Sequence, residues 1–506
     1  MLGSQLARNV AITGGAALLL LWYTVRRKRL REEEEKWPAY SEESALQNIR
    51  AITNKKTVCQ WMLNATRKNG KYFRIRMLLP GEKVFVVTDV KMVRTVLSGN
   101  PELMGIEGFD KVPDGTKRFS AFTQGVPSIL TKLTNGQGPV DGWSWARKSL
   151  SPAFSMRNLL KRLPTIQRRI STLEGIIRAH DARGEAIDCC EWMLRFSIDV
   201  LFSSMFNVDS DTLREDKEET LGTRALSLFR LATEEIFGKR SGNKLRKYMF
   251  WDPSMRQALR AIDELMDLMA EIQEDYRATH TPKEIQADTG IMAHLLRAPY
   301  PDERARTADT LIFVLAGHDT TGYTLSWLLV ELGRHPHVLT TLQRELDKVN
   351  PSSGEWTGEM ASRCPYLLNV IKEVMRLWPV TALGGMGRSS PTHELVCDDG
   401  KVIPRNAIVL YPFIAIGRND IKDGDAFIPE RWEDTRGPDA ARLKEAYMPF
   451  GLGKRMCMGQ SLAQLEIRLL VATLAQRFDL QLVSGPSPEY YLSLKPANAH
   501  IRMRPR

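Results

Sequence analysis

One cysteine lies in a short loop whose neighbours would suit it as a metal ligand. The segment FGLGKRMCMG runs from Phe450 to Gly459 and places Cys457 after Gly453 and Arg455. Glycines let the backbone bend and approach a flat, bulky group closely. A helix is predicted to begin just after Cys457, and the positive end of its dipole favours the thiolate over the thiol. Amide donors in the loop would also reduce the electron donation of a metal-bound thiolate to a workable level.

A carboxylate-binding arginine beside the thiolate narrows the choice of metal group. Arg455 keeps its charge and can bind a carboxylate through two parallel hydrogen bonds, which suits haem iron with its propionates. The pattern F-x-x-G-x-R-x-C-x-G resembles the signature of the cytochrome P450 family, the haem-thiolate monooxygenases. Three further segments resemble the family in the same order, between about residue 38 and the C-terminus. The resemblance implies haem b as cofactor, Cys457 as the axial ligand of its iron, and haem contacts from Phe450, Gly453, Arg455 and Gly459.

The first of these segments is WSWAR. Trp143 and Arg147 are four residues apart and share one face of a predicted helix. The resemblance makes both of them contacts of the haem propionates. Arg388, in GMGR, occupies the place of another propionate-binding arginine. The alternative for Trp143 and Arg147 is an ordinary aromatic–cation pair.

The second segment, AGHDTT, lies in a long apolar run that is predicted to be helical. Gly317 followed by Thr320 and Thr321 predicts a local opening of that helix, because threonine hydroxyls can bond the carbonyl four residues back. An acid next to a hydroxyl in apolar surroundings is suited to proton transfer. The resemblance assigns proton delivery during dioxygen cleavage to Asp319 and Thr320, and no role to Thr321. The alternative is a helix that is merely bent.

The third segment, IKEVMRLWP, carries a pair of opposite charges. Glu373 and Arg376 are three residues apart on a helix that is predicted to end before Pro379. The local run is apolar, which favours burial, and a buried pair needs additional partners. The resemblance supplies Arg431, in PERW, as the third member. It makes all three residues a structural network around the cysteine loop rather than catalytic groups.

The elements that position these residues are mostly helical. Helical periodicity dominates from Trp143 to about Leu346, and a further helix follows Cys457 to about Phe478. Strands are predicted at 72–77 and 84–87, a short capped helix follows from Asp89 to Leu97, and the stretch 104–140 reads as irregular. We therefore expect a mainly α fold with a smaller β part at both sequence ends. No linker follows residue 40, so residues 37–506 are predicted to form a single haem-thiolate monooxygenase domain.

The N-terminal segment 1–36 is predicted to be a membrane anchor with a charged linker. Val10–Val25 is an uncharged apolar run of 16 residues, and five cations follow it between Arg26 and Arg31. This charge pattern keeps the rest of the chain on the cytosolic side. A cleaved signal peptide is the alternative, although no small-residue cleavage site precedes the cations. The resemblance to membrane-anchored microsomal enzymes implies the endoplasmic reticulum.

Composition excludes some classes of function. The net charge of +11 comes without a basic cluster interleaved with aromatics, so nucleic acid is not an expected partner. A membrane surface, an acidic protein partner and a diffusely basic surface all fit the charge. Six cysteines without a CxxC pair indicate reduced thiols rather than a disulfide framework.

The resemblance implies oxygen insertion into a lipophilic substrate, with electrons from NADPH through a membrane-bound flavoprotein reductase. The layout resembles the branch that includes fatty-acid hydroxylases. Some of those enzymes carry a glutamate that bonds covalently to haem where this chain has Ala316. A sterol, a terpenoid or another hydrophobic metabolite is an equal candidate. Two alternatives remain open: a haem-thiolate isomerase or dehydratase that acts on a hydroperoxide without a reductase, and a non-catalytic haem sensor or carrier.

Overall fold

The computed structural model describes residues 34–77, 83–98, 110–111, 113–132, 142–216, 218–239, 246, 248–249, 251–385, 387–390, 393–434 and 436–506. The candidate anchor Val10–Val25 lies outside these ranges. Among the helices of the described residues, none combines the length and the apolar character needed to cross a bilayer. The expected anchor and the domain boundary at residue 36 stay predictions.

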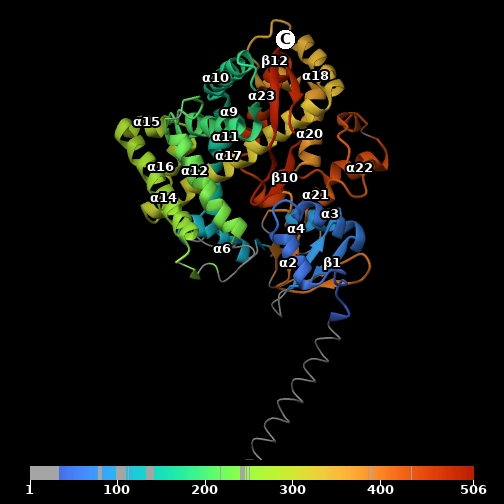
Figure 1. The fold of residues 1–506 in the computed structure, drawn as a ribbon. Coiled ribbons are helices and arrows are strands. Elements are labelled where there is room, and N and C mark those ends of the chain that lie inside the picture. Colours follow the sequence, from blue (N-terminus) through green and yellow to red (C-terminus); the bar gives the residue numbers. More distant parts are fainter. Residues whose placement is uncertain are drawn as a thin grey trace, which may run out of the picture.

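Helices make up most of the fold, as the sequence predicted (Figure 1). The described α-helices are α2 (Ala45–Thr53), α3 (Val58–Asn69), α4 (Val90–Ser98), α6 (Pro113–Phe122), α8 (Trp143–Leu150), α9 (Met156–Leu160), α10 (Leu163–Ala182), α11 (Cys189–Val200), α12 (Leu221–Thr233), α14 (Pro253–Thr279), α15 (Pro282–Ala287), α16 (Ile291–Arg297), α17 (Glu303–Arg334), α18 (Pro336–Val349), α19 (Gly358–Ser362), α20 (Pro365–Leu377), α21 (Phe413–Ile416), α22 (Gly437–Ala446) and α23 (Gln460–Arg477). Wider π-helical turns extend α11 and α12 at η2 (Leu201–Phe206) and η3 (Glu234–Lys239). Tight 3₁₀ turns occur at η1 (Ser151–Phe154), η5 (Pro429–Trp432) and η6 (Gly453–Arg455).

The strands are short; most come from the first or the last quarter of the chain, and β4 comes from the part between them. They are β1 (Tyr72–Ile75), β2 (Val84–Val87), β3 (Asp110–Lys111), β4 (Ile187–Asp188), β5 (Arg388–Ser389), β6 (Leu395–Val396), β7 (Val402–Ile403), β8 (Ile408–Leu410), β9 (Phe478–Leu482), β10 (Ser487–Tyr490), β11 (Leu494–Ala497) and β12 (His500–Pro505). Within the described residues, the largest sheet has the order β1-β2-β8-β5-β3, and the others are β4-β12-β9, β10-β11 and β6-β7.

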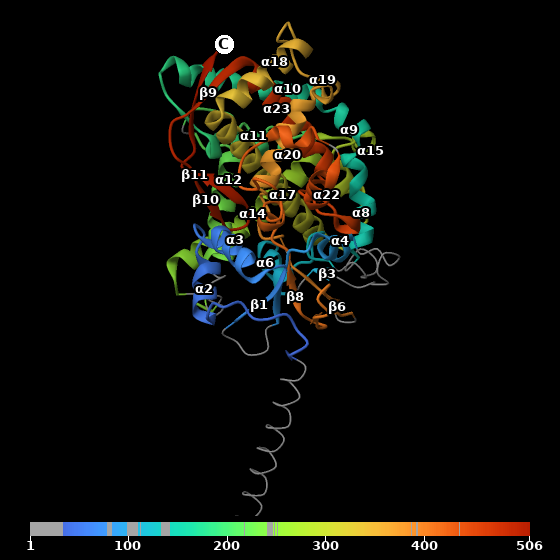
Figure 2. The ribbon, with the colours of Figure 1, turned by 90° about the vertical axis from the view of Figure 1, so that its right-hand side faces the viewer.

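The five-stranded sheet joins the N-terminal part to the last quarter of the chain. β1 pairs antiparallel with β2, and β2 runs parallel to β8, with Val84 opposite Ile408. Alternate residues of β2 enter separate cores: Phe85 packs in the cluster that contains α4, and Val86 packs in the cluster that contains α3. Burial on both faces explains the continuous apolar run of this strand. Figure 2 shows this sheet with α2, α3 and α4 at the end of the molecule opposite the C-terminus.

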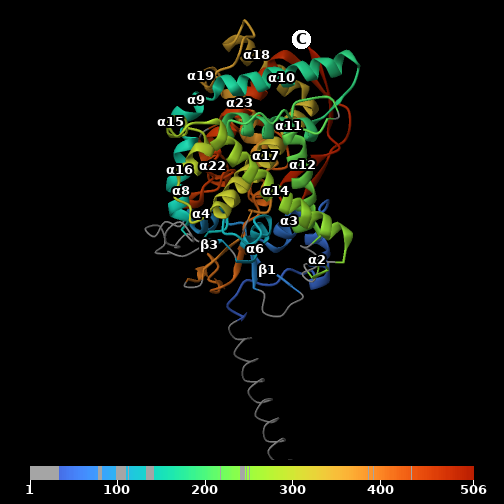
Figure 3. The ribbon, with the colours of Figure 1, turned by 90° about the vertical axis from the view of Figure 1, so that its left-hand side faces the viewer.

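The long helix α17 runs through the middle of the helical part (Figure 3). It begins after Asp302, whose side chain caps the amide of Ala305. It packs closely against α11 and η2 because two of its residues are glycines. A Cβ on Gly317 would lie 2.8 Å from the side chain of Leu201, and one on Gly322 would lie 2.9 Å from Leu194.

Two local predictions differ from the structure. The stretch 104–140 was expected to be irregular, but α6 begins inside it at Pro113, a residue that is well suited to the first turn of a helix. The helix opening expected near Gly317 does not occur, because α17 is continuous from Glu303 to Arg334. The bond from the Thr320 hydroxyl to the carbonyl of Ala316, at 2.9 Å, is accommodated within the regular helix.

Candidate active site

The cysteine loop is a bent segment closed by its own backbone. The amide of Cys457 donates to the carbonyl of Phe450 at 2.9 Å, and the amide of Met456 donates to that of Gly453 at 3.1 Å. Gly453 has φ of +68°, and a Cβ there would lie 2.4 Å from the carbonyl oxygen of Ser98. The glycine is therefore required by both its conformation and its contact with the end of α4.

The environment of the Cys457 sulfur acts on its pKa in two directions. Desolvation by the surrounding protein atoms raises the pKa although the side chain is accessible from one side, whereas the amides of Gly459 and Gln460 and the charge of Arg147 lower it. The amides at the helix start therefore favour the thiolate, as expected, but the net shift of the pKa is upward. The helix begins only at Gln460, and the desolvation of the sulfur outweighs its amides. A bound metal cation would supply the missing compensation.

Two arginines and one indole stand beside this loop. Arg147 donates from Nη1 to the carbonyl of Met456 at 2.7 Å, which links α8 directly to the residue before the cysteine. The guanidinium of Arg455 lies 4.5 Å from the Trp143 ring centroid, and that of Arg147 lies 6.0 Å from it. The structure thus brings together Trp143, Arg147, Arg455 and Cys457. Their roles toward haem stay predictions.

Arg388 lies on β5, in the five-stranded sheet. It is buried, and its guanidinium lies 5.8 Å from the centroid of the Tyr411 ring. Its assignment to a propionate also stays a prediction.

The face of α17 that carries Ala316 is not covered by other protein side chains. Ala316 is exposed although Leu315 and His318 are buried, and Thr320 lies one turn further along the same face. A methyl group at position 316 leaves the backbone of the helix open to a flat ligand. An uncovered helix face, a cysteine held among backbone amides and two arginines over an indole form a set of donors that fits haem with its two propionates.

Asp319 points away from the Thr320 hydroxyl, since consecutive residues of a helix are about 100° apart. The hydroxyls of Tyr323 and Ser493 approach its carboxylate, and the charge of Lys495 also acts on it. Burial dominates these influences and raises the pKa of Asp319 above its ordinary value. The Asp319 carboxylate therefore faces the start of β11, whereas the Thr320 hydroxyl lies on the face of α17 that carries Ala316.

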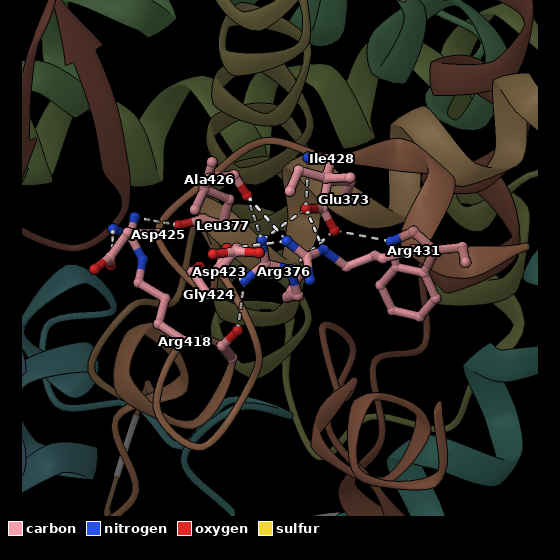
Figure 4. A network of polar contacts seen from close by, with 12 residues as sticks. Glu373, Arg376, Leu377, Arg418, Asp423, Gly424, Asp425, Ala426, Ile428 and Arg431 are labelled. Atoms are coloured by element: carbon pink, nitrogen blue, oxygen red, sulfur yellow. Dashed lines mark hydrogen bonds and ion pairs between the residues drawn. The ribbon is translucent and has the colours of Figure 1, made fainter. Parts of the chain in front are cut away.

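The charged pair of α20 is buried and forms the network shown in Figure 4. Glu373 accepts two hydrogen bonds from Arg376, at 2.7 and 2.9 Å, and one from Nε of Arg431 at 2.8 Å. Arg376 also donates to three backbone carbonyls of the segment 417–426. The network fixes this segment, which leads from β8 toward the cysteine loop, against α20.

Several residues that contact the site were not identified from the sequence. Lys132 and Asp309 form a buried ion pair, and the carbonyl of Lys132 accepts from Arg455. A single lysine in an irregular stretch carries no signal, whereas an aspartate at the start of the apolar run of α17 was a signal that could have been noticed. Tyr323 follows Asp319 by four residues on α17, so helical spacing could have indicated their contact. Ser493 approaches Asp319 from the turn before β11, and no sequence spacing connects these two.

Comparison with known proteins identifies the family. Residues 45–500 match the model of the family described as cytochrome P450. The chain is 25% identical to putative cytochrome P450 CYP13A3 of Caenorhabditis elegans over 84% of this chain and 85% of that one. It is 26% identical to cytochrome P450 3A31 of Mesocricetus auratus, over 81% and 79% of the two chains. It is 28% identical to cytochrome P450 monooxygenase polC of Polytolypa hystricis, over 71% and 67%. With the family match covering most of its length and the cysteine loop, the two arginines and the Ala316 face in place, this chain belongs to the cytochrome P450 family of haem-thiolate monooxygenases.

Proposed function

We propose that this chain is a membrane-anchored monooxygenase that inserts one atom of dioxygen into a lipophilic substrate. Electrons come from NADPH through a flavoprotein reductase, and the N-terminal segment holds the enzyme at the cytosolic face of the endoplasmic reticulum. The observation that carries the proposal is the gathering of Cys457, Arg147, Arg455 and Trp143 at one loop. A thiol for a metal and two cations for carboxylates fit an iron porphyrin with propionates.

Haem bound at this site supplies the activation of dioxygen and the acceptance of single electrons. The chain would hold and orient it: Cys457 Sγ would be the ligand to iron, and Trp143, Arg147, Arg388 and Arg455 would hold the propionates. The cysteine loop residues Phe450, Gly453 and Gly459 shape the surface against which the ring lies.

Asp319 and Thr320 would handle protons for the reaction. The Thr320 hydroxyl is held by the carbonyl of Ala316 and lies on the uncovered face of α17. A raised pKa lets Asp319 carry a proton closer to neutral pH than an ordinary aspartate does. Tyr323 and Ser493 lie beside this acid, which faces the start of β11.

The substrate is proposed to be apolar because the described surroundings of the Ala316 face are apolar. Phe313 precedes Thr320 on α17 by about two helical turns and lies on the same face, and its ring stacks on that of Phe154 with centroids 5.9 Å apart. A glutamate one residue before Gly317 would allow an ester link to haem, but that residue is Ala316. Haem is therefore held without this link, and the proposed substrate class includes sterols and terpenoids as well as fatty acids.

The reductase is proposed to dock on the side of the cysteine loop. Lys454 is exposed in this loop, and the chain carries a net charge of +11. Both suit an acidic protein surface through charge complementarity.

The ligand assignment is tested by the difference spectrum of the reduced protein with carbon monoxide. The full chain, reconstituted with haem, should show the strongly red-shifted Soret band of a thiolate ligand, and Cys457→Ser should lose it. A band typical of imidazole ligation in folded wild-type protein would refute the assignment.

The proton assignment is tested by coupling. The assay contains reductase, NADPH and a lipophilic compound that shifts the spin state. Thr320→Ala should keep haem but form less product per NADPH oxidised than the wild type. The matched control is Thr321→Val, which changes the buried neighbouring threonine to which no role is assigned. Unchanged coupling in Thr320→Ala would remove the role of that hydroxyl.

A further inference from the structure

A fully buried lysine lies beside the site, and the proposed function does not use it. The Lys132 side chain is 0% exposed, and its Nζ lies 3.7 Å from Oδ2 of Asp309, which is also 0% exposed. The ammonium forms no hydrogen bond with any of the described residues. It lies 5.4 Å from the ring centroid of Trp145 and 5.5 Å from that of Tyr300.

Two further groups hold the carboxylate of Asp309, which lies on α17. Its Oδ1 accepts from the backbone amide of Ile129, and its Oδ2 accepts from the Tyr300 hydroxyl at 2.7 Å. Asp309 precedes Ala316 by seven residues, or about two helical turns, so it lies on the helix face that also carries Ala316 and Thr320.

The turn at 128–132 connects this aspartate with the cysteine loop. The Lys132 amide donates to the carbonyl of Ser128 at 2.8 Å, and the Ser128 amide donates to the Thr131 hydroxyl, also at 2.8 Å. These two bonds close the turn. At one end the amide of Ile129 and the ammonium of Lys132 face Asp309. At the other end the carbonyl of Lys132 accepts from Nη2 of Arg455 at 2.6 Å.

A buried ion pair with poor hydrogen bonding contributes little to stability, and apolar side chains of similar volume often stabilise a core more. Arg455, in contrast, depends on this turn for one of its hydrogen bonds. The distance between the Arg455 guanidinium and the Ala316 face of α17 is thus set through one short turn that is attached to both.

We propose that Lys132 and Asp309 are positioning residues that hold Arg455, and with it the cysteine loop, in register with the face of α17 that carries Ala316 and Thr320. They touch neither haem nor substrate. The inference rests on the proposed function, because it assumes that Arg455 binds a haem propionate.

The structure offers a matched control for Asp309. Asp199 in α11 is also 0% exposed and also faces a cation, with Nε of Arg169 at 3.3 Å. Its Oδ1 accepts from a hydroxyl, that of Ser210, and from a backbone amide, that of Thr212. The two aspartates thus have the same kinds of partner, but within the described part of the chain the side-chain partners of Asp199 are Arg169, Ser210 and Thr212, none of which belongs to the cysteine loop.

The test measures the rate at which haem leaves the full-length holoenzyme for an excess of apomyoglobin, together with the midpoint of urea unfolding. Asp309→Asn and Lys132→Met should each accelerate haem loss at least tenfold, and Arg455→Ala should do the same. Asp199→Asn should lower the unfolding midpoint as much as Asp309→Asn but change haem loss less than twofold. Combined with Arg455→Ala, neither Asp309→Asn nor Lys132→Met should accelerate haem loss further, because both act through Arg455.

The outcomes separate the two proposals. If Arg455→Ala retains haem as the wild type does, the propionate role of Arg455 is refuted. If Arg455→Ala loses haem quickly but Asp309→Asn and Lys132→Met do not, or if Asp199→Asn loses it equally fast, the positioning role is refuted. The positioning role is also refuted if Asp309→Asn or Lys132→Met accelerates haem loss further in the Arg455→Ala background. Should either single variant fail to fold, the double variant Lys132→Met/Asp309→Asn, which removes both buried charges together, is subjected to the same comparison.

Discussion

Replacement of Glu373 by glutamine should cost this protein about 4 kcal/mol of unfolding free energy, because the carboxylate is the acceptor on which the α20 network depends. Five donors reach it: Nε and Nη2 of Arg376, Nε of Arg431, Nε1 of Trp432 and the amide of Ile428. A glutamine offers one acceptor oxygen and turns an NH₂ group toward the arginines. Each charge-assisted bond contributes about 1.5–3 kcal/mol, and removing one partner of a buried ion pair costs about 3–5 kcal/mol. The bonds of Arg376 to three backbone carbonyls remain and keep the loss near the middle of that range.

The assay is urea unfolding of the full chain at pH 7, followed by far-UV circular dichroism. The control is Glu303→Gln, since Glu303 is 65% exposed and its pairs with Arg277 and Arg306 should contribute less than about 1 kcal/mol. The network lowers the pKa of Glu373 below its ordinary 4.5. Its contribution is therefore present above pH 4.5 and lost as the pH falls through the lower folded-state value. A loss no larger than that of Glu303→Gln, or a difference that persists unchanged into strong acid, would refute this reasoning.

Three further predictions concern the site and its surroundings. Gly453→Ala should prevent stable haem loading, because its Cβ would lie 2.4 Å from the carbonyl of Ser98 at a φ of +68°; a normal haem-to-protein absorbance ratio would contradict this. Glu466→Gln should gain stability relative to the wild type as the pH rises from about 5 to 8, by on the order of 3 kcal/mol. Burial raises the pKa of Glu466 to about 8, so folding disfavours its ionisation and stability falls with pH, whereas glutamine does not titrate; a pH-independent difference in urea midpoints would contradict this. Gly317→Ala should cost about 1–2 kcal/mol in the same assay, because its methyl group meets the flexible end of Leu201 at 2.8 Å, and an unchanged midpoint would contradict the tight packing of α17.

Local sequence signals located most of the elements. Pro379 correctly indicated the end of α20, and the helix after the cysteine loop ends at Arg477, within one residue of its predicted end. β2 begins and ends where its apolar run does. The misses have local causes: α6 was overlooked because its residues have weak apolar periodicity within a stretch rich in glycine and proline, and the Thr320 hydroxyl satisfies the carbonyl of Ala316 without opening α17.

The sequence by itself determined the family of this protein, because the family's motifs consist of residue types at short spacing. Cys457 among glycines, Trp143 four residues before Arg147, and Asp319 next to Thr320 are each readable within a few residues. The apolar run around Glu373 and Arg376 indicated a buried pair that would need additional partners.

Only the tertiary structure decided how these groups are held and what their electrostatics are. Lys132 and Asp309 are 177 residues apart, and Gly453 meets Ser98 from the far end of the chain. The pKa of Cys457 is raised rather than lowered because burial, which no local pattern encodes, outweighs the nearby amides. Burial and contacts between distant segments arise only when the chain packs, and they are what the spacing of residues along the sequence leaves undetermined.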